Sequence, residues 1–344
     1  MEHRLALENK ERKTLSQYAS FSDSSRGRQM PEEEDGLRTC YQRDRDRIIH
    51  CKAFRRLKHK TQVFYSPEGD HYRTRLTHTL EVSQIARTIA SALELNENLT
   101  EAIALGHDLG HTPFGHAGES ALNTVVSGGF MHNVQSLRVV DHVEKREGHE
   151  QPGLNLTWEV RDGILAHSWG WEPKASTLEG QVVMLADKIA YINHDFDDAV
   201  RAGVVGEADV PREVKALLGA DRRTRLNTLV MGAIDESYGK GGILLSKDAE
   251  YGLNAMRDFM FDRVYLNQGA AKAESERCKR LVIQLFLYYT SFPDELSKDS
   301  CYCFDASDSH AVSRAAVDYI AGMTDRFAVM VFSRIYIPKP WQIF

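Results

Sequence analysis

Apolar residues recur at helical spacing through most of the chain. Between residues 76 and 93, Leu76, Leu80, Ile85, Ile89 and Leu93 return every four or five positions, which predicts an apolar stripe along one helix. Strong helix formers then lead directly into His107. Alternating apolar and polar residues, the pattern of a half-buried strand, are scarce. The chain is therefore expected to be all-α.

The same periodicity predicts helices elsewhere, separated by loops rich in serine, glycine and acidic residues. The helices are expected at residues 77–93, 100–105, 178–200, 222–237, 253–266, 274–289 and 312–332. The loops are expected at residues 22–35, 65–71, 127–130, 147–153 and 297–308. With no internal repeat and no clean linker, one helical domain with peripheral extensions is the simplest organisation.

Three regions follow from this organisation. We expect residues 1–40 to form an N-terminal extension with a mobile loop, residues 41–210 to form the catalytic core, and residues 211–344 to form a helical part packed on that core. The role of the last region is not readable from its sequence.

Composition places the chain among soluble globular proteins, with 42% hydrophobic and 27% charged residues. No apolar run approaches the roughly 20 residues that a membrane-spanning helix needs, and the first residues lack a hydrophobic signal segment. We therefore expect a cytoplasmic protein without a membrane partner. The five cysteines include no Cys-x-x-Cys pair, which predicts free thiols.

Charge is distributed unevenly along the chain. The net charge is −6, whereas residues 1–60 hold 15 lysines and arginines against 10 acidic residues. Such a basic section can face phosphate groups, or it can be an ordinary solvated surface of mixed charge. The overall negative sign argues against nucleic acid as the main partner.

Candidate chemistry concentrates in residues 107–119. This segment carries three histidines and two carboxylates, interrupted by three glycines and Pro113. Imidazole nitrogens and carboxylate oxygens suit a divalent transition metal or an ion such as Mg or Mn, and the glycines allow backbone and ligands to approach closely. Hydrolysis at phosphorus is the chemistry that such a cluster most readily serves.

Two further helices carry residues that can complete a metal shell. His78 lies on the helix before His107 and Asp108, and Asp187 interrupts an apolar stretch on a later helix. Either residue alone is more simply a hydrogen-bonded core residue. Together, two imidazoles and two carboxylates on three helices predict a metal centre with positions open for water and phosphate.

Other polar residues lie at suggestive spacings. Asp187, Tyr191 and Asp195 are spaced at i, i+4 and i+8, so one helix face can present all three. Glu119 follows His116 by three residues and can raise the basicity of that imidazole and fix its tautomer. The simpler interpretations are a buried Tyr191–Asp195 pair and a capping role for His116.

Several motifs between residues 43 and 200 resemble the HD-domain deoxynucleoside triphosphate triphosphohydrolases, particularly the shorter bacterial proteins called deoxyguanosinetriphosphate triphosphohydrolase-like. The motifs are RDRII at 45–49, AFRRL at 53–57, KTQVF at 60–64, RTRLTH at 73–78, the segment 107–119, FMHN at 130–133 and DKIAY at 187–191. Residues 201–344 match less clearly.

The resemblance implies an HD-domain helical bundle that hydrolyses dGTP and other dNTPs to deoxynucleoside and inorganic triphosphate, with water attacking the α-phosphorus. It assigns one divalent ion, Mn, Mg, Fe, Ni or Zn, to four ligands. These ligands are His78, His107, Asp108 and Asp187. It also implies that His111 and His116, with Glu119 beside them, transfer protons and handle phosphate.

The resemblance also implies a set of substrate contacts. Lys188 and Arg75 would contact phosphates, and Tyr191 would touch phosphate or sugar. Asp195 with Gln62 would read the deoxyribose hydroxyl, and His132 and Asn133 would belong to the same pocket. The simpler interpretation of Lys188 and Arg75 is ordinary surface charge. A homo-oligomer, commonly a hexamer, and a second dNTP acting as an allosteric activator are further implications.

Other functions fit the sequence less well. An alarmone hydrolase of the HD superfamily should carry acidic residues directly after the His-Asp pair, where this chain has Leu109, Gly110 and His111. A two-metal phosphodiesterase needs extra bridging ligands, which His111, His116 and His132 could supply, so it remains the alternative enzyme. A non-catalytic dNTP sensor would have no need of a complete metal quartet.

Overall fold

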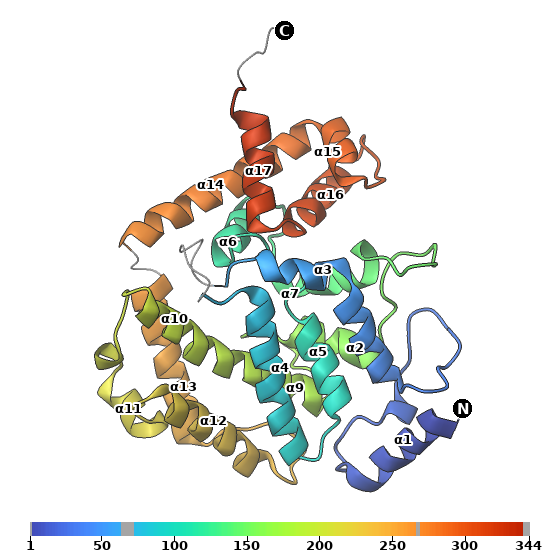
Figure 1. Ribbon diagram of the computed structural model, residues 1–344, viewed down its shortest axis with the longest axis vertical. Coiled ribbons are helices and arrows are strands. Elements are labelled where there is room, and N and C mark those ends of the chain that lie inside the picture. Colours follow the sequence, from blue (N-terminus) through green and yellow to red (C-terminus); the bar gives the residue numbers. More distant parts are fainter. Residues whose placement is uncertain (1, 63–71, 266–268, 340–344) are drawn as a thin grey trace.

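The computed structural model describes residues 2–62, 72–265 and 269–339, and these residues confirm the all-α prediction. The described residues form helices joined by turns and loops, with only isolated β-bridges such as the one between Thr61 and Thr74. Figure 1 shows the helices arranged as a large body with a smaller group of helices at one end.

The first half of the chain holds most of the helices that carry candidate site residues. Its helices are α1 (Glu2–Thr14), η1 (Ser22–Ser24), α2 (Cys40–His50), α3 (Lys52–Arg56), η2 (Leu57–His59), α4 (Arg75–Ala92), α5 (Glu97–Gly106), α6 (His116–Val125), α7 (His132–Arg138), η3 (Val139–Val143) and α8 (Trp158–Ala166). The second half continues with α9 (Leu178–Ala190), η4 (Tyr191–Asp195), α10 (Phe196–Arg201), η5 (Glu207–Asp209), α11 (Arg212–Leu218), α12 (Arg222–Ser237), α13 (Lys247–Met260), η6 (Phe261–Tyr265), α14 (Gly269–Ser291), α15 (Pro293–Ser300), α16 (Ser309–Ala321) and α17 (Asp325–Tyr336).

Helices α4, α5 and α9 form the centre of the larger apolar core. α4 packs against both α5 and α9, and α5 packs against α2. The predicted stripe on α4 is correct for Ile85, Ile89 and Leu93, which are buried, but wrong for Leu80, which is 51% exposed. Leu80 lies five residues before Ile85, and at 100° per residue that step carries it off the buried face.

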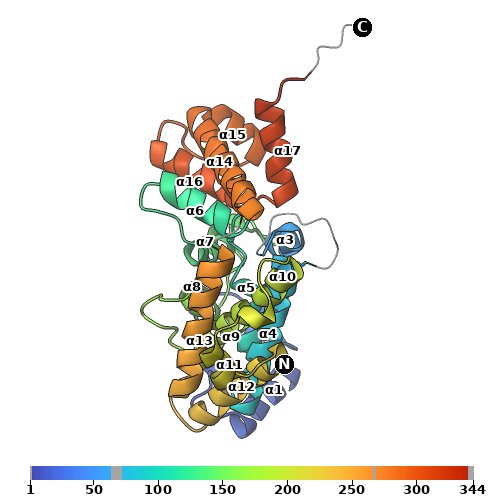
Figure 2. The same ribbon diagram turned by 90° about the vertical axis from the view of Figure 1, so that its left-hand side faces the viewer.

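A second apolar core joins α6 to the C-terminal helices. Leu122 of α6 lies in one buried cluster with Val282 of α14, Val317 of α16 and Val331 of α17. Figures 1 and 2 both place α6 beside α14–α17, at the opposite end from α11–α13. Because α6 begins inside the candidate site segment, that segment connects the two cores. The predicted boundaries at residues 40 and 210 stay predictions.

Three predicted helices are interrupted in the structure. The helices expected at 178–200 and 253–266 contain the π-helical turns η4 and η6, and the helix expected at 312–332 ends at Ala321 and restarts at Asp325. The break between Ala321 and Asp325 has a local cause, because the Thr324 side chain accepts a hydrogen bond from the Phe327 backbone and caps a new helix there. Periodicity alone cannot detect a break that leaves the apolar face in register.

Polar contacts tie the segment 22–35 to the core. The Arg26 backbone N–H donates to Glu159, Arg28 pairs with the buried Asp44, and Glu32 pairs with Arg47. The predicted loop at 65–71 lies outside the described residues, and so does the predicted helix end at 266. All five cysteines are free thiols, as predicted. In the described part of the chain, none of the helices has the length and apolarity to cross a membrane.

Candidate functional site

Four side chains from three helical segments converge on one point, as expected for a metal centre. His78 comes from α4, His107 and Asp108 directly follow α5, and Asp187 lies near the end of α9. His78 Nε2 lies 3.0 Å from Asp187 Oδ1. His107 Nε2 lies 3.7 Å from Asp108 Oδ2 and 3.8 Å from Asp187 Oδ1. His78, His107 and Asp108 form one group whose donor atoms could hold an ion, and His107 and Asp187 with His167 form a second, so His107 is common to both.

The hydrogen bonding of His107 fits a metal ligand. Its Nδ1 lies 2.6 Å from the carbonyl oxygen of Ala104, so Nδ1 carries the proton and Nε2 presents a lone pair. Nε2 is buried and has no hydrogen-bond partner among the described residues. A buried polar atom without a partner is costly unless a ligand satisfies it. A divalent ion between His107 and the two carboxylates would do so.

Both carboxylates of the centre are held ionised. Burial raises the pKa of Asp108, but Arg75 and the neighbouring histidines outweigh burial and hold that pKa well below its usual range. For Asp187, burial is likewise outweighed, chiefly by the hydrogen bond from His78, so its pKa also lies below the usual range. Asp187 keeps a quarter of its side chain exposed, so the centre opens toward solvent on its side.

His167 joins this centre, although the sequence analysis did not select it. Its Nδ1 lies 2.6 Å from the carbonyl oxygen of Ile164, and its ring centroid lies 4.9 Å from that of His107. Burial and the neighbouring histidines lower its pKa to about 3, so the ring is neutral. His167 follows helix α8 just as His107 follows α5, with the same bond to a carbonyl three residues earlier, a similarity that only the structure reveals.

Glu119 organises a second cluster of histidines. Its Oε1 accepts hydrogen bonds from both the backbone N–H and Nδ1 of His132, the latter at 2.8 Å. Its Oε2 lies 3.8 Å from His111 Nε2 and 3.9 Å from His116 Nδ1. Thus the carboxylate that sequence spacing associates with His116 is hydrogen-bonded to His132 and lies within ion-pair distance of the other two.

The protonation states in this second cluster differ. Burial raises the pKa of Glu119, but His132 and His116 outweigh burial and lower it, so the carboxylate is ionised. Partial burial lowers the pKa of His132, but Glu119 outweighs it and raises the pKa of this imidazole above the usual value. Burial and the charge of Arg75 hold the pKa of His111 well below its usual value. The cluster therefore places His132, whose pKa is raised, beside His111, whose pKa is lowered.

Glycines allow the segment 107–119 to fold tightly against α7. A Cβ atom on Gly110 would lie 2.1 Å from the backbone nitrogen of Ser136, and one on Gly118 would lie 2.0 Å from the carbonyl oxygen of Pro113. Neither backbone atom can move aside easily. The predicted close approach is confirmed, and it brings His111 next to His132, with ring centroids 5.0 Å apart.

Arg75 is buried beside the metal centre, which rules out the surface-charge interpretation. Its Nη1 donates to Asp108 Oδ2 at 2.6 Å. Its Nε and Nη2 are buried without a hydrogen-bond partner among the described residues. Gln62 is also buried, and its Oε1 lacks a partner in the same part of the chain. A guanidinium with two donors that no described residue satisfies is costly unless a ligand such as an anion pairs with them.

The other predicted substrate contacts lie around the end of α9. Lys188 is half-buried, and its Nζ lies 4.6 Å from the centroid of the Trp169 ring. Tyr191 and Asp195 begin and end the π-helical turn η4. In an α-helix, residues four positions apart are rotated by about 40° around the helix axis, so Asp187, Tyr191 and Asp195 would gradually leave a common face. The wider π turn offsets part of this rotation. Asn133 donates its side-chain amide to the carbonyl oxygen of Leu165, which leaves its Oδ1 for another contact.

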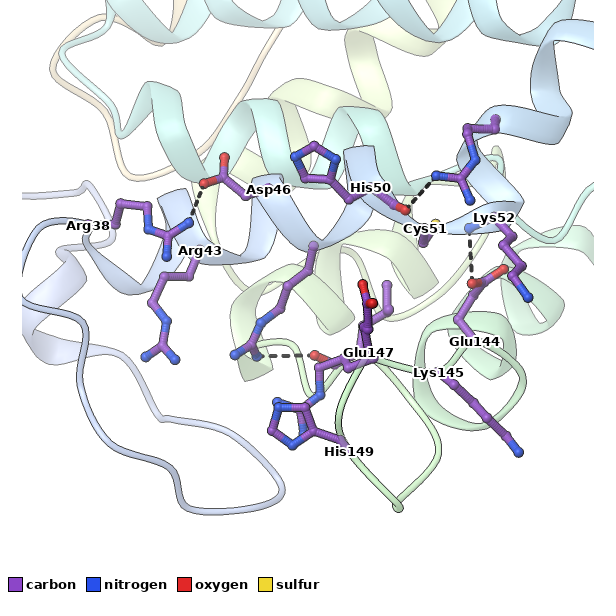
Figure 3. A pocket seen from close by; sticks show the side chains of 14 residues that line it. Arg38, Arg43, Asp46, His50, Cys51, Lys52, Glu144, Lys145, Glu147 and His149 are labelled. Carbon is purple, nitrogen blue, oxygen red and sulfur yellow. Dashed lines mark hydrogen bonds and ion pairs between the residues drawn. The ribbon is translucent and has the colours of Figure 1, made fainter.

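A separate cavity of about 650 Å³ lies between α2 and the loop around Lys145. Figure 3 shows Arg38, Arg43 and His50 on one side and Glu147 and His149 on the other. Seven lysines and arginines line it against three acidic residues, so it is strongly cationic. None of the proposed metal ligands lines it. Lysines and arginines of the locally basic section at residues 1–60 line this cavity.

Comparisons with known proteins identify the family of this chain. The family model of the HD domain matches residues 75–192, and that of the phosphohydrolase-associated domain matches residues 243–334. A protein of Caldanaerobacter subterraneus subsp. tengcongensis is 54% identical, covering 99% of this chain and 98% of its own length. One of Clostridium perfringens is 48% identical, covering 98% of this chain and 99% of its own. Both are named deoxyguanosinetriphosphate triphosphohydrolase-like protein.

Among solved structures, a phosphohydrolase of Bacteroides thetaiotaomicron shares the fold with a TM-score of 0.50 at 16% identity, over 85% of this chain and 69% of the other. The range of the HD match includes the four converging side chains, from His78 to Asp187. The chain therefore belongs to the deoxyguanosinetriphosphate triphosphohydrolase-like proteins, a family of HD-domain phosphohydrolases.

Proposed function

We propose that the protein hydrolyses dNTPs, dGTP among them, to deoxynucleoside and inorganic triphosphate by water attack at the α-phosphorus. The observation that carries the proposal is the pairing of a metal-type cluster with Arg75. His107 Nε2 and two Arg75 nitrogens are buried without hydrogen-bond partners among the described residues. A metal ion would satisfy His107 Nε2, and a phosphate would satisfy the two Arg75 nitrogens. The names of the relatives support a dNTP as the source of that phosphate.

One divalent ion would be held by His78, His107, Asp108 and Asp187. When bound, it would polarise the phosphate and offset the charge that develops during hydrolysis. The mixture of nitrogen and oxygen donors accommodates Mn, Mg, Fe, Ni or Zn. His167 lies close enough to supply a further nitrogen.

The histidines around Glu119 would move the protons of the reaction. His132 donates Nδ1–H to Glu119, and its Nε2 lies 3.2 Å from Nε2 of His167. His132 Nε2 also lies 3.2 Å from Ser168 Oγ. Glu119 raises the pKa of the His132 imidazole, whereas burial and the charge of Arg75 lower the pKa of His111. We assign proton transfer to His111 and His116, with Glu119 setting the charge balance of the cluster.

Substrate contacts would surround the opening beside Asp187. Arg75 and Lys188 would bind phosphates, and Tyr191 phosphate or sugar. Gln62 and Asp195 would bind the deoxyribose hydroxyl, with His132 and Asn133 in the same pocket. Buried polar groups that hydrogen-bond a substrate hydroxyl discriminate strongly against analogues that lack it. We also propose that the pocket closes tightly around C2′ and excludes the additional 2′-hydroxyl of a ribonucleotide sterically, so that dNTPs are used well and ribonucleoside triphosphates poorly.

The test is incubation of the purified protein with all four dNTPs and with GTP, singly and mixed, with Mn or Mg. Product analysis distinguishes triphosphate plus deoxynucleoside from pyrophosphate plus monophosphate. The Asp187→Ala protein serves as the control for contaminating activity. Equal rates on dGTP and GTP would contradict the deoxyribose pocket. Binding of dNTPs by a metal-loaded protein without any product would favour a nucleotide sensor.

A two-metal phosphodiesterase remains the second candidate, because further His and acidic groups lie together. Asp108, His132 and His167 form one such group, and His111, His116 and Glu119 form another. Metal analysis discriminates between the two functions. The triphosphohydrolase proposal expects one ion per chain, whereas two tightly bound ions and turnover of a phosphodiester would favour the alternative.

We also propose that the cationic cavity between α2 and Lys145 receives the phosphates of an effector dNTP. Its excess of lysine and arginine and its separation from the metal ligands support this assignment. Assembly as a homo-oligomer, a hexamer in particular, is part of the same proposal. Rates measured with dNTP mixtures, together with molar mass by light scattering, test both parts.

A further inference from the structure

Two cations share one exposed aromatic ring at the opening of the metal centre. Trp169 lies two residues after His167 and is 37% exposed. Lys188 Nζ lies 4.6 Å from the centroid of its ring, and Arg257 Cζ lies 4.7 Å from it. Lys188 directly follows Asp187, the partly exposed residue of the quartet. The ring therefore gathers positive charge on the side where the centre opens.

Holding the positive charges of Lys188 and Arg257 at one ring is electrostatically unfavourable without an anion. Lys188 is also within electrostatic range of Lys174, whose like charge opposes its own. The acidic neighbours of the group are Asp187, Glu250 and Asp258. Asp258 pairs with Arg257 at 2.7 Å, but its side chain is 65% exposed, so solvent screens that pair. Asp187 is directed to the metal centre, which leaves the cations with weak compensation.

The three residues come from separate parts of the chain. Trp169 belongs to the loop between α8 and α9, Lys188 to α9, and Arg257 to α13. α13 lies within the phosphohydrolase-associated region, outside the HD match. The ring thus brings a residue of the second family region to the site formed by the first.

We infer that Trp169 is a positioning residue whose indole ring holds Lys188 and Arg257 ready for the distal phosphates of the substrate. The inference rests on the proposed function and adds this ring and Arg257 to it. A cation held against an aromatic face loses little further freedom when a phosphate arrives, so the ring lowers the entropic cost of binding. The reacting atoms lie at the metal centre, so Trp169 affects substrate binding rather than the chemical step.

The test is calorimetric titration with inorganic tripolyphosphate at fixed ionic strength and without added divalent ion, which would chelate the probe. Trp169→Ala should weaken binding about 5- to 30-fold, the range that two cation–π contacts allow. Trp169→Phe should recover part of the loss, because a phenyl ring still attracts cations but less strongly. Trp171→Phe, an aromatic change in the same loop, should bind as the unchanged protein does.

Kinetics and a second pair of variants separate positioning from a merely structural role. In Trp169→Ala, KM for a dNTP should rise by a factor similar to the loss of binding, while kcat changes less than about 3-fold. Lys188→Ala should weaken tripolyphosphate binding less in the Trp169→Ala background than in the unchanged protein, because the two residues act together. If Trp169→Ala does not fold, Trp169→Phe and Arg257→Gln provide the same comparison.

Unchanged or tighter binding by Trp169→Ala would overturn the inference, since the ring would then be neutral or compete with phosphate. A fall in kcat with unchanged KM would overturn it too. Failure of the proposed function is separable. If the unchanged protein does not hydrolyse dNTPs but the tripolyphosphate pattern holds, only the function is wrong. If it hydrolyses them and the pattern is absent, only the inference is wrong.

Discussion

His107 and His167 present the same nitrogen to the same point because each has its other nitrogen bonded to a carbonyl three residues earlier. The sequence pattern predicted His107 because it stands in a polar cluster with Asp108 and His111. It did not indicate His167, which stands alone after an apolar helix. Chain spacing identifies ligands that are neighbours in sequence. A ligand that only the packing of α8 against α5 and α7 brings close leaves no such pattern.

Removing one ligand of the quartet should release the ion. Asp187→Ala or His107→Ala leaves too few protein donors to hold a metal tightly, so we expect loss of bound metal and of turnover. Metal analysis of the dialysed protein measures the first and product formation the second. His142→Ala, an exposed histidine outside the site, is the matched control and should retain its metal. Full occupancy in Asp187→Ala would show that this residue is not a ligand.

His116 separates chemistry from binding. Its side chain is 53% exposed and lies 3.9 Å from Glu119, so it can be removed without opening the core. His116→Ala should keep metal and dNTP binding and lose about 100-fold in the chemical step, the usual scale for a positioned acid or base. Single-turnover rates with saturating dNTP provide the measurement. Near-normal turnover would leave proton transfer to His111 and His132.

At the scale of elements, periodicity predicted most helices but not their interruptions. The stripe predicted α4, and apolar spacing located α12 and α14. It missed η4 and the break before α17, because a π turn and a capping threonine alter the backbone while the apolar pattern continues. The glycines of the segment 107–119, in contrast, did predict a feature of the backbone. They mark places where another backbone approaches too closely for a side chain.

Gly110 should tolerate no Cβ atom. Gly110→Ala places a carbon 2.1 Å from the Ser136 backbone, so α7 must shift, at a cost of about 1–3 kcal/mol in the free energy of unfolding. Gly242→Ala is the control, because a Cβ there meets nothing within 4 Å and should change stability by less than about 0.5 kcal/mol. Urea denaturation of the three proteins measures both. Equal stability of the two variants would contradict the close approach.

At the scale of the whole molecule, two polar residues fasten the C-terminal helices to the site. Asp325, at the start of α17, accepts hydrogen bonds from the backbone N–H groups of Thr61 and Phe114. Lys60 is buried and donates to the carbonyl oxygens of His111 and Ala321. The sequence could not predict these links, because they run through backbone atoms, and those that reach the C-terminal helices join residues more than 200 positions apart. The family resemblance located the catalytic segment but left the packing of residues 201–344 open.

Lys60 should make stability depend on pH. Burial lowers its pKa to about 7, against 10.5 in an unfolded chain. Between these values the unfolded chain binds more protons than the folded one, so the free energy of unfolding should rise with pH. From pH 7 to 8.5 the expected contribution is about 1.5 kcal/mol. As a neutral amine, Lys60 can still donate to both carbonyls.

Lys60→Met removes this titration while nearly conserving the volume of the side chain. The difference in unfolding free energy between the unchanged protein and the variant should therefore grow over the same pH window, as measured by urea denaturation at several pH values. A difference that stays constant with pH would show that Lys60 is charged in both the folded and the unfolded states.

The most direct measurement of the central claim is hydrolysis of dGTP in water enriched in oxygen-18, with mass analysis of both products. If water attacks the α-phosphorus and the 5′-oxygen leaves with the sugar, one labelled oxygen appears in the triphosphate and none in deoxyguanosine. Asp187→Ala, run in parallel, should give no product. Label in deoxyguanosine, release of pyrophosphate with dGMP, or turnover that survives in Asp187→Ala would contradict hydrolysis at the His78–His107–Asp108–Asp187 centre.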